Sequence, residues 1–238
     1  MDRRRFIKLC GTTAALAGIQ GLPVGQANAT EMQRFNRVKL VDDKGAPLKA
    51  SSLSTAEAYI FTYPFKGTPC FLINLGSKPA SNVALTSNDG DYVWPGGVGG
   101  KGTVVAYSAI CAHQLSYPNK EHTPISYMGS ESSKVAGRAG VIVCCEHNRV
   151  YDPAEGGKMV ATDKKATPPL LTIMLEHDGA TDELFAIGVL GGATFDEFFK
   201  SYKNELREAY GAGVAKEEMA DTTPTVLLSQ YTGVCDRC

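Results

Sequence analysis

Two short motifs that pair a cysteine with a histidine give this chain its most evident chemistry. The first has the spacing C-x-H and joins Cys111 to His113. The second has the spacing C-x-x-H and joins Cys144 to His147. One thiolate and one imidazole from each motif make up the ligand set of a 2Fe–2S cluster in which histidines replace the cysteines on one iron. The four residues are therefore the predicted ligands of such a cluster, which carries one electron at a time.

A zinc site is the alternative for the same four side chains, since zinc also accepts two thiolates and two imidazoles. The chain would then be an exported binding module stabilised by zinc. The C-x-H spacing disfavours this interpretation because it is tighter than the cysteine pairs, two to four residues apart, of common zinc modules.

Short β-prone runs must position both motifs. Strands are predicted where β-branched and aromatic residues cluster between glycine, proline and aspartate, at 37–41, 58–65, 69–75, 103–110, 141–145, 170–176 and 184–190. The sequence HDGATDE between the last two runs predicts a hairpin loop. The body is therefore expected to be an antiparallel all-β structure, with each motif on a loop at the end of a strand.

One amphipathic helix is predicted after the strands. Its apolar face at helical spacing holds Phe195, Phe198, Phe199, Tyr202 and Leu206, within 195–210. The following segment, 211–238, is polar and contains proline, which predicts a linker or a loosely attached tail. Within it, Cys235 and Cys238 predict a local disulfide or two exposed thiols. Cys70, in an apolar run, is expected in the core.

Residues 1–29 predict an export signal. Arg3 and Arg4 begin the pattern R-R-x-F, followed by an apolar residue and lysine, which resembles a twin-arginine signal. An apolar run at 9–22 and an A-x-A pattern at 27–29 follow. The apolar run is shorter than the roughly 20 residues of a spanning helix, so cleavage is favoured over an uncleaved anchor. The protein is therefore expected in the periplasm or on the periplasmic side of the inner membrane, and an ordinary secretory signal is the alternative.

Composition and charge limit the remaining function classes. Hydrophobic residues make up 43% and charged residues 21% of the chain, as in a soluble protein with a sizeable core. The formal net charge is −1 and the basic residues are scattered, so nucleic acid is excluded as a partner. The length of 238 residues fits a single domain, expected at 30–210 between signal and tail.

The sequence resembles the Rieske iron–sulfur family. Both motifs carry this resemblance, together with the AYSAIC sequence that leads into the first and the YDPAEGG sequence that follows the second, over about 104–189. It implies an antiparallel β-sandwich whose cluster-binding part spans about 103–170. It also implies that Cys111 and Cys144 bind the buried iron. His113 and His147 would then bind the outer iron.

The implied function is one-electron transfer, as a subunit of, or a soluble carrier for, a respiratory or periplasmic redox enzyme. Members of the cytochrome bc type and small subunits of arsenite oxidase look most similar, since they also combine such a domain with a twin-arginine signal. The implied partners are a c-type cytochrome, a larger oxidoreductase subunit or a quinol. The chain is not expected to catalyse turnover alone.

Several positions depart from that family. Ser116 and Glu146 occupy the places of two cysteines that form a bridging disulfide in cytochrome bc members, so that bridge is absent. Cys145 has no obvious partner and is expected to be a free, partly buried thiol. Arg149 replaces a serine of high-potential members, whereas Tyr151 keeps a tyrosine that donates to a cysteine sulfur. Hydrogen bonds to sulfur raise the potential, so we expect a midpoint within roughly −150 to +300 mV, below that of quinol-oxidising members.

Two further segments extend the resemblance. The interval from Gln114 to Val143 is longer than usual, which predicts an extra lobe near the cluster, including residues 119–122. The proline-bearing segment 166–169 is a candidate for a third loop that shields the cluster. An ordinary turn between strands is equally compatible with its sequence.

Overall fold

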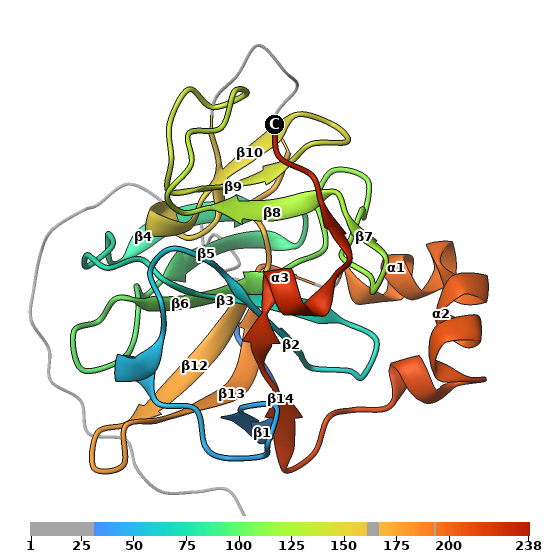
Figure 1. Cartoon of the computed structure of the whole chain (residues 1–238), viewed down its shortest axis with the longest axis horizontal. Coiled ribbons are helices and arrows are strands. Elements are labelled where there is room, and N and C mark those ends of the chain that lie inside the picture. Colours follow the sequence, from blue (N-terminus) through green and yellow to red (C-terminus); the bar gives the residue numbers. More distant parts are fainter. Residues whose placement is uncertain (1–30, 161–166, 193) are drawn as a thin grey trace, which may run out of the picture.

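The computed structural model describes residues 31–160, 167–192 and 194–238. The predicted export signal at 1–29 lies outside the described residues. A large β-sheet forms the base of the molecule, a small sheet lies above it, and helices flank one side (Figure 1). No helix in the described ranges is long and apolar enough to cross a membrane.

The large sheet has eight strands in the order β14-β1-β13-β12-β6-β3-β2-β15. Their bounds are β1 Gln33–Val41, β2 Tyr59–Thr62, β3 Pro69–Asn74, β6 Val104–Ser108, β12 Thr172–Asp178, β13 Glu183–Leu190, β14 Thr222–Pro224 and β15 Val226–Leu227. Neighbours are antiparallel except β1 and β14, which are parallel. All seven predicted β runs lie on strands of the structure, which confirms the expected antiparallel β architecture.

The two edges of this sheet meet, because β14 and β15 are consecutive in sequence and pair with opposite edges. The N–H of Thr62 donates to the hydroxyl of Thr223 at 3.2 Å, and that hydroxyl lies 3.1 Å from the carbonyl oxygen of Thr62. Closing a sheet in this way satisfies backbone groups that an open edge would leave exposed.

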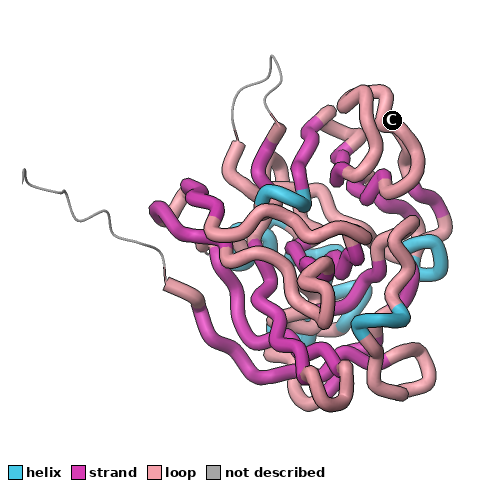
Figure 2. The backbone as a smooth tube through the Cα atoms, turned by 90° about the vertical axis from the view of Figure 1, so that its left-hand side faces the viewer, coloured by secondary structure: helices cyan, strands magenta, loops and turns pink. Residues whose placement is uncertain are grey.

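The small sheet contains β8 (Ile125–Met128), β9 (Val141–Cys144), β10 (Arg149–Asp152) and β11 (Lys158–Met159), in the order β11-β10-β9-β8. A separate hairpin is formed by β4 (Val83–Ser87) and β5 (Gly90–Trp94). The expected extra lobe contains β7 (His122–Thr123), which pairs in parallel with β16 (Val234–Cys235) near the C-terminus. Figure 2 shows the strands of both sheets from a second side.

A shared apolar core fixes the small sheet to the large one. It includes the fully buried Trp94, Tyr107 and Tyr151. The hydroxyl of Tyr107, on β6, donates to the carbonyl oxygen of Pro153 at 2.7 Å. Because Pro153 begins the turn after β10, this bond joins the two sheets directly.

The YDPAEGG sequence folds tightly beneath that bond. The Asp152 side chain accepts from the N–H of Ala154 at 2.8 Å and caps the short 3₁₀ helix η2 (Pro153–Glu155). Gly156 follows with φ of 76°, and a Cβ there would lie 2.7 Å from Leu85. Only glycine fits this position because it combines a left-handed backbone with close packing.

The predicted amphipathic helix forms as two, α1 (Phe195–Ser201) and α2 (Lys203–Tyr210), which divide at Tyr202. The expected apolar face is confirmed, because all of its residues except Tyr202 are buried, namely Phe195, Phe198, Phe199 and Leu206. A third short helix, α3 (Leu228–Tyr231), and two 3₁₀ turns, η1 (Ala50–Ser52) and η3 (Val214–Lys216), complete the elements.

The expectation of a loosely attached tail after Tyr210 was wrong. The segment supplies β14, β15 and β16, each paired with the body. In Figure 1 its last part runs up beside β8 to the top of the small sheet. The sequence did not indicate this packing. The segment is polar, and its strands of two or three residues are too short to show an alternation of apolar and polar residues.

The predicted hairpin between β12 and β13 is confirmed. Its loop ends at Asp182, which has a left-handed φ of 59°. The hydroxyl and N–H of Ser51 donate to Asp182 at 2.6 and 3.0 Å, and Nε2 of His177 lies 2.8 Å from it. The Ser51 hydroxyl first, and then His177, lower the pKa of Asp182 to about 2.

Candidate metal centre

The first motif lies on a compact turn after β6. The N–H of Cys111 donates to the carbonyl oxygen of Ser116 at 2.8 Å, and the N–H of Leu115 donates to that of Cys111 at 2.9 Å. These two bonds fold the loop back on itself. As a result, Cys111 is fully buried while His113 keeps partial exposure.

The second motif occupies the turn between β9 and β10. Cys144 ends β9 and is fully buried, whereas the side chain of His147 is 20% exposed. Asn148 closes the turn with a φ of 51°, a conformation that asparagine tolerates better than most residues. Each motif therefore directs its cysteine inward and its histidine outward.

The structure brings the four predicted ligands together. The thiols of Cys111 and Cys144 hydrogen-bond to each other. The rings of His113 and His147 meet edge to face, with centroids 5.1 Å apart. The Nδ1 atom of His147 lies 3.9 Å from Sγ of Cys144. Buried thiols thus stand behind half-exposed imidazoles.

The environment of the thiols favours one thiolate. The Cys144 thiol donates to Cys111, and the Tyr151 hydroxyl also contributes, which lowers the pKa of Cys111 to about 6. The same hydrogen bond raises the pKa of Cys144, because losing its proton would place two negative charges side by side in a buried position. Metal binding would replace the shared proton, since thiolates and not thiols are metal ligands.

A metal group fits these side chains. The Nδ1 atom of His113 is buried and has no hydrogen-bond partner among the described residues. A buried nitrogen of this kind costs free energy unless a ligand satisfies it. No three histidine, cysteine or acidic side chains of the described ranges converge on one point suited to a single ion. A Rieske-type cluster does not need such a group, because each of its irons takes only two protein ligands.

A hydrogen bond joins the two loops where a disulfide is lacking. The hydroxyl of Ser116 donates to the carboxylate of Glu146. It also lies 3.5 Å from Nδ1 of His147. The two residues identified as replacing the bridging cysteines are therefore still in contact, through a polar link.

Tyr151 and Arg149 both reach the site from β10. The hydroxyl of Tyr151 lies 3.4 Å from Sγ of Cys111. Burial raises the pKa of Tyr151, so the hydroxyl keeps its proton and can donate to the sulfur. Arg149 is buried, which its sequence position had not indicated.

The cysteines outside the ligand set differ from expectation. Cys145 is not a free thiol, because it forms a disulfide with Cys238 across 93 residues of sequence. The expected local pairing of Cys235 with Cys238 was therefore wrong as well, and Cys235 is a half-buried free thiol. Cys70 is fully buried in the core, as predicted.

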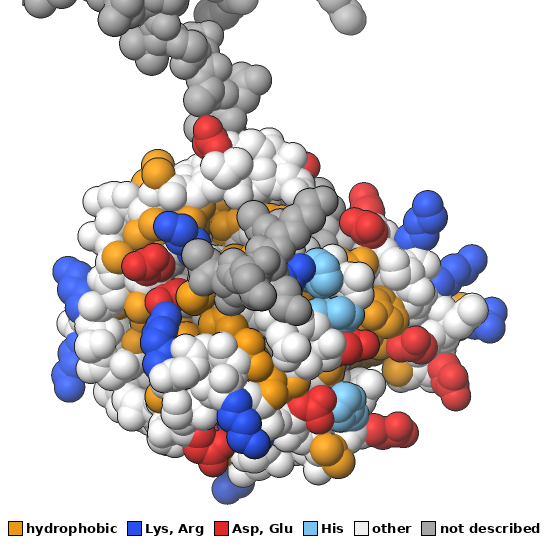
Figure 3. All heavy atoms as spheres, turned by 90° about the horizontal axis from the view of Figure 1, so that it is seen from above, with side chains coloured by type: hydrophobic (Ala, Val, Ile, Leu, Met, Phe, Trp, Pro, Cys, Tyr) orange, Lys and Arg blue, Asp and Glu red, His pale blue; other side chains and the backbone are white. Residues whose placement is uncertain are grey.

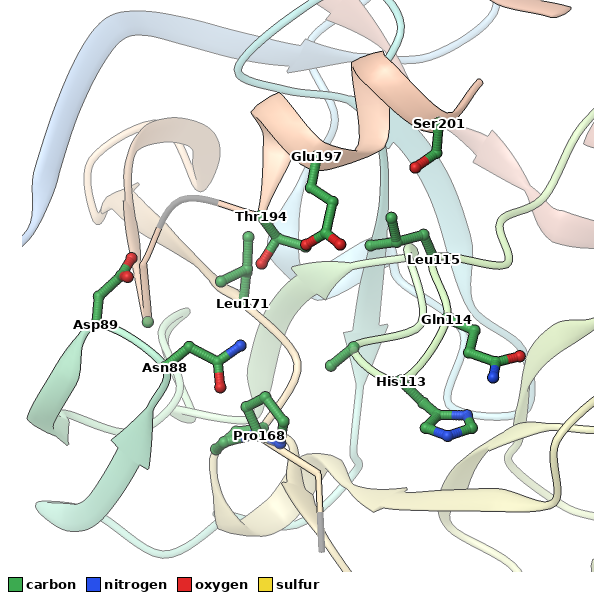
Figure 4. Close-up of a pocket in the computed structure, with 13 residues that line it drawn as sticks. Asn88, Asp89, His113, Gln114, Leu115, Pro168, Leu171, Thr194, Glu197 and Ser201 are labelled. Atoms are coloured by element: carbon green, nitrogen blue, oxygen red, sulfur yellow. The ribbon is translucent and has the colours of Figure 1, made fainter. Parts of the chain in front are cut away.

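A polar cavity of about 620 Å³ lies beside His113 (Figure 4). One wall is the first motif's loop, another is α1 with Glu197 and Ser201, and Pro168 lies at its base. The described part of the proline-bearing segment is thus near the first motif. Its first residue, Ala166, lies outside the described residues.

Seen from above, histidine side chains gather on one face of the molecule, with acidic side chains beside them (Figure 3). The side chain of His147 is 20% exposed and that of His113 is partly exposed, so the imidazoles are the accessible part of the site.

No family model matches the chain. The chain is 29% identical over 192 residues to the iodate reductase subunit IdrB of Pseudomonas sp. (strain SCT), and the match covers 80% of each protein. It is also similar to the soluble domain of the Rieske protein II (soxF) from Sulfolobus acidocaldarius, with 24% identity and a TM-score of 0.44. That match covers 65% of this chain and 78% of the other.

The antiparallel β fold joins two loops, each with one buried thiol and one outward imidazole, as the resemblance to the Rieske family implies. The relative from Pseudomonas is named as a subunit of a reductase, which is an oxidoreductase.

Proposed function

We propose that this chain passes single electrons to or from a larger oxidoreductase in the periplasm, as its subunit or its soluble carrier. In this proposal Cys111 and Cys144 hold the inner iron of the cluster. His113 and His147 hold the outer iron. The name of the Pseudomonas relative favours a subunit of a reductase, and iodate is the corresponding candidate substrate of the partner.

The assignment of the ligands rests on a difference in burial between the cysteines and the histidines. The two cysteines are fully buried and in contact, whereas the two imidazoles lie together at the surface. Bound there, a 2Fe–2S cluster supplies a one-electron redox couple. The thiolates would keep one iron away from water, and the imidazoles would present the other to a partner.

Two partners are compatible with this arrangement besides a catalytic subunit. A c-type cytochrome would meet the imidazole face directly. A quinol could give its proton to an imidazole as it gives up its electron, since histidine can change charge near neutral pH. The sequence at 1–29 supports location in the periplasm, because a twin-arginine signal exports proteins that are already folded.

The first test is the visible and electron paramagnetic resonance spectrum of the purified protein, with iron and acid-labile sulfide analysis. We expect two irons and two sulfides per chain, as the cluster requires, and the spectrum of a reduced Rieske centre. Cys144→Ser should abolish the spectrum. Cys70→Ser is the matched control, because this core thiol lies outside the site and donates to the carbonyl oxygens of Tyr63 at 3.0 Å and Thr68 at 3.7 Å, which serine can also do. A colourless protein with one zinc per chain would overturn the proposal.

The second test concerns partner and location. Reduced protein, freed of reductant, should reduce a purified ferric c-type cytochrome with one electron per cluster. Cell fractionation should find the protein in the periplasm, and replacing Arg3 and Arg4 with lysine should retain it in the cytoplasm. Retention of the signal-variant protein in the periplasm would contradict the proposed route.

A further inference from the structure

We propose that Arg149 is the fixed positive charge of this redox site, placed on the buried face of β10 to favour uptake of the electron. This inference rests on the proposed function. It assigns to one residue of the chain a role in setting the midpoint potential.

Strand register places Arg149 at the site. Arg149 pairs directly with Cys144 across the β9–β10 ladder, and Tyr151 pairs with Ile142. Directly opposed residues, and residues two apart on one strand, share a face of a sheet. Arg149 therefore projects from the same face as Cys144 and Tyr151, and Tyr151 reaches Sγ of Cys111.

The guanidinium has unsatisfied donors in a buried position. Arg149 is only 6% exposed, and its Nε and Nη1 atoms have no hydrogen-bond partner among the described residues. Burying a charged group without an anionic partner is costly. A nearby arginine, Arg138, shows the ordinary solution, because its Nη2 lies 2.6 Å from the carboxylate of Asp152.

The groups around Arg149 indicate which negative charges balance that of its guanidinium. The site collects the sulfurs of Cys111 and Cys144, which become negative when they bind metal. Arg149 faces Cys144 directly across the β9–β10 ladder, and Tyr151, on the same face of β10, reaches the sulfur of Cys111. The guanidinium thus lies beside the sulfurs of both loops.

A fixed positive charge shifts a redox equilibrium in a known direction. Adding an electron makes the site more negative, and a nearby cation stabilises that state more strongly in a buried position than in water. Arginine suits this role because it does not lose its proton in proteins. The contribution of Arg149 is therefore constant across physiological pH.

The test compares midpoint potentials of holoproteins measured by optical redox titration. Arg149→Met keeps much of the volume and removes the charge, and it should lower the equilibrium constant for reduction by about tenfold or more. Arg149→Lys should retain most of the wild-type value. Arg138→Met is the control and should leave the potential unchanged, because this exposed charge is already paired.

Each outcome decides the matter. If Arg149→Met holds a full cluster at the wild-type potential, the inference is overturned although the wild-type spectrum still supports the proposed function. If the methionine variant holds no cluster and the lysine variant does, the charge is required and the inference stands. If neither variant holds a cluster, Arg149 has a structural role that depends on the guanidinium shape, and the inference fails.

Discussion

The disulfide between Cys145 and Cys238 should account for a large share of the free energy of unfolding. It closes a loop of 93 residues, and the chain-entropy treatment gives about 4.7 kcal/mol for a loop of that length at 25 °C. Removing native disulfides typically costs about 2–5 kcal/mol. Cys238→Ser should therefore lower the free energy of unfolding by an amount in that range, and lower the Tm by roughly 5–15 °C.

The assay is thermal unfolding of the holoprotein by far-ultraviolet circular dichroism. Cys145→Ser and Cys238→Ser should be equally destabilised, and combining them should add little, because both remove the same bond. Cys235→Ser is the matched control, since this thiol lies three residues from Cys238 and is free. A Tm for Cys238→Ser within 2 °C of wild type, or an equal loss in the Cys235 variant, would refute the reasoning.

Three further outcomes are expected. Tyr151→Phe removes the hydroxyl 3.4 Å from Sγ of Cys111 and should lower the midpoint potential without loss of iron, because hydrogen bonds to the sulfurs favour the reduced state; optical redox titration checks this. Tyr107→Phe removes the 2.7 Å bond to Pro153 and should cost about 1–2 kcal/mol of unfolding free energy, measured by urea titration. The pKa of Asp182, about 2 in the folded chain, lies below its ordinary value near 3.8, so its stabilising contribution is present above pH 4 and is lost as pH falls towards 2. Asp182→Asn should therefore flatten the pH dependence of the urea midpoint in that window, and an unchanged dependence would count against this assignment.

Local sequence pattern was sufficient for most of the large sheet and for the grouping of the site. The continuous apolar run 69–75 became a buried strand, because both faces of the large sheet are covered at β3. The spacing within each motif placed one cysteine and one histidine at a strand end, which suffices to bring the pairs together once the two loops meet.

The hairpin β4–β5 was missed although the sequence contained a signal for it. Its strands alternate between buried and exposed residues around Asn88, Asp89 and Gly90, which is a turn sequence between alternating runs. The sequence masks this alternation because Val93 is an apolar residue at an exposed position.

Contacts between distant segments could not be predicted. The partner of Cys145 lies 93 residues away, and cysteine spacing does not specify connectivity. The burial of Arg149 depends on the register of β9 and β10, which no single strand encodes. The tail packs through strands of two or three residues, and these are too short to carry a period.

The disulfide between Cys145 and Cys238 also distinguishes chains that have reached an oxidising compartment from chains that have stayed in the cytoplasm. A reducing cytoplasm keeps such thiols unpaired, whereas the periplasm oxidises them. If the chain is exported as proposed, Cys145 and Cys238 join only after folding and passage across the membrane, because residue 238 must already lie against the second motif. The fraction of bridged chains in a whole-cell extract would then serve as an internal record of export, readable by alkylation and gel shift.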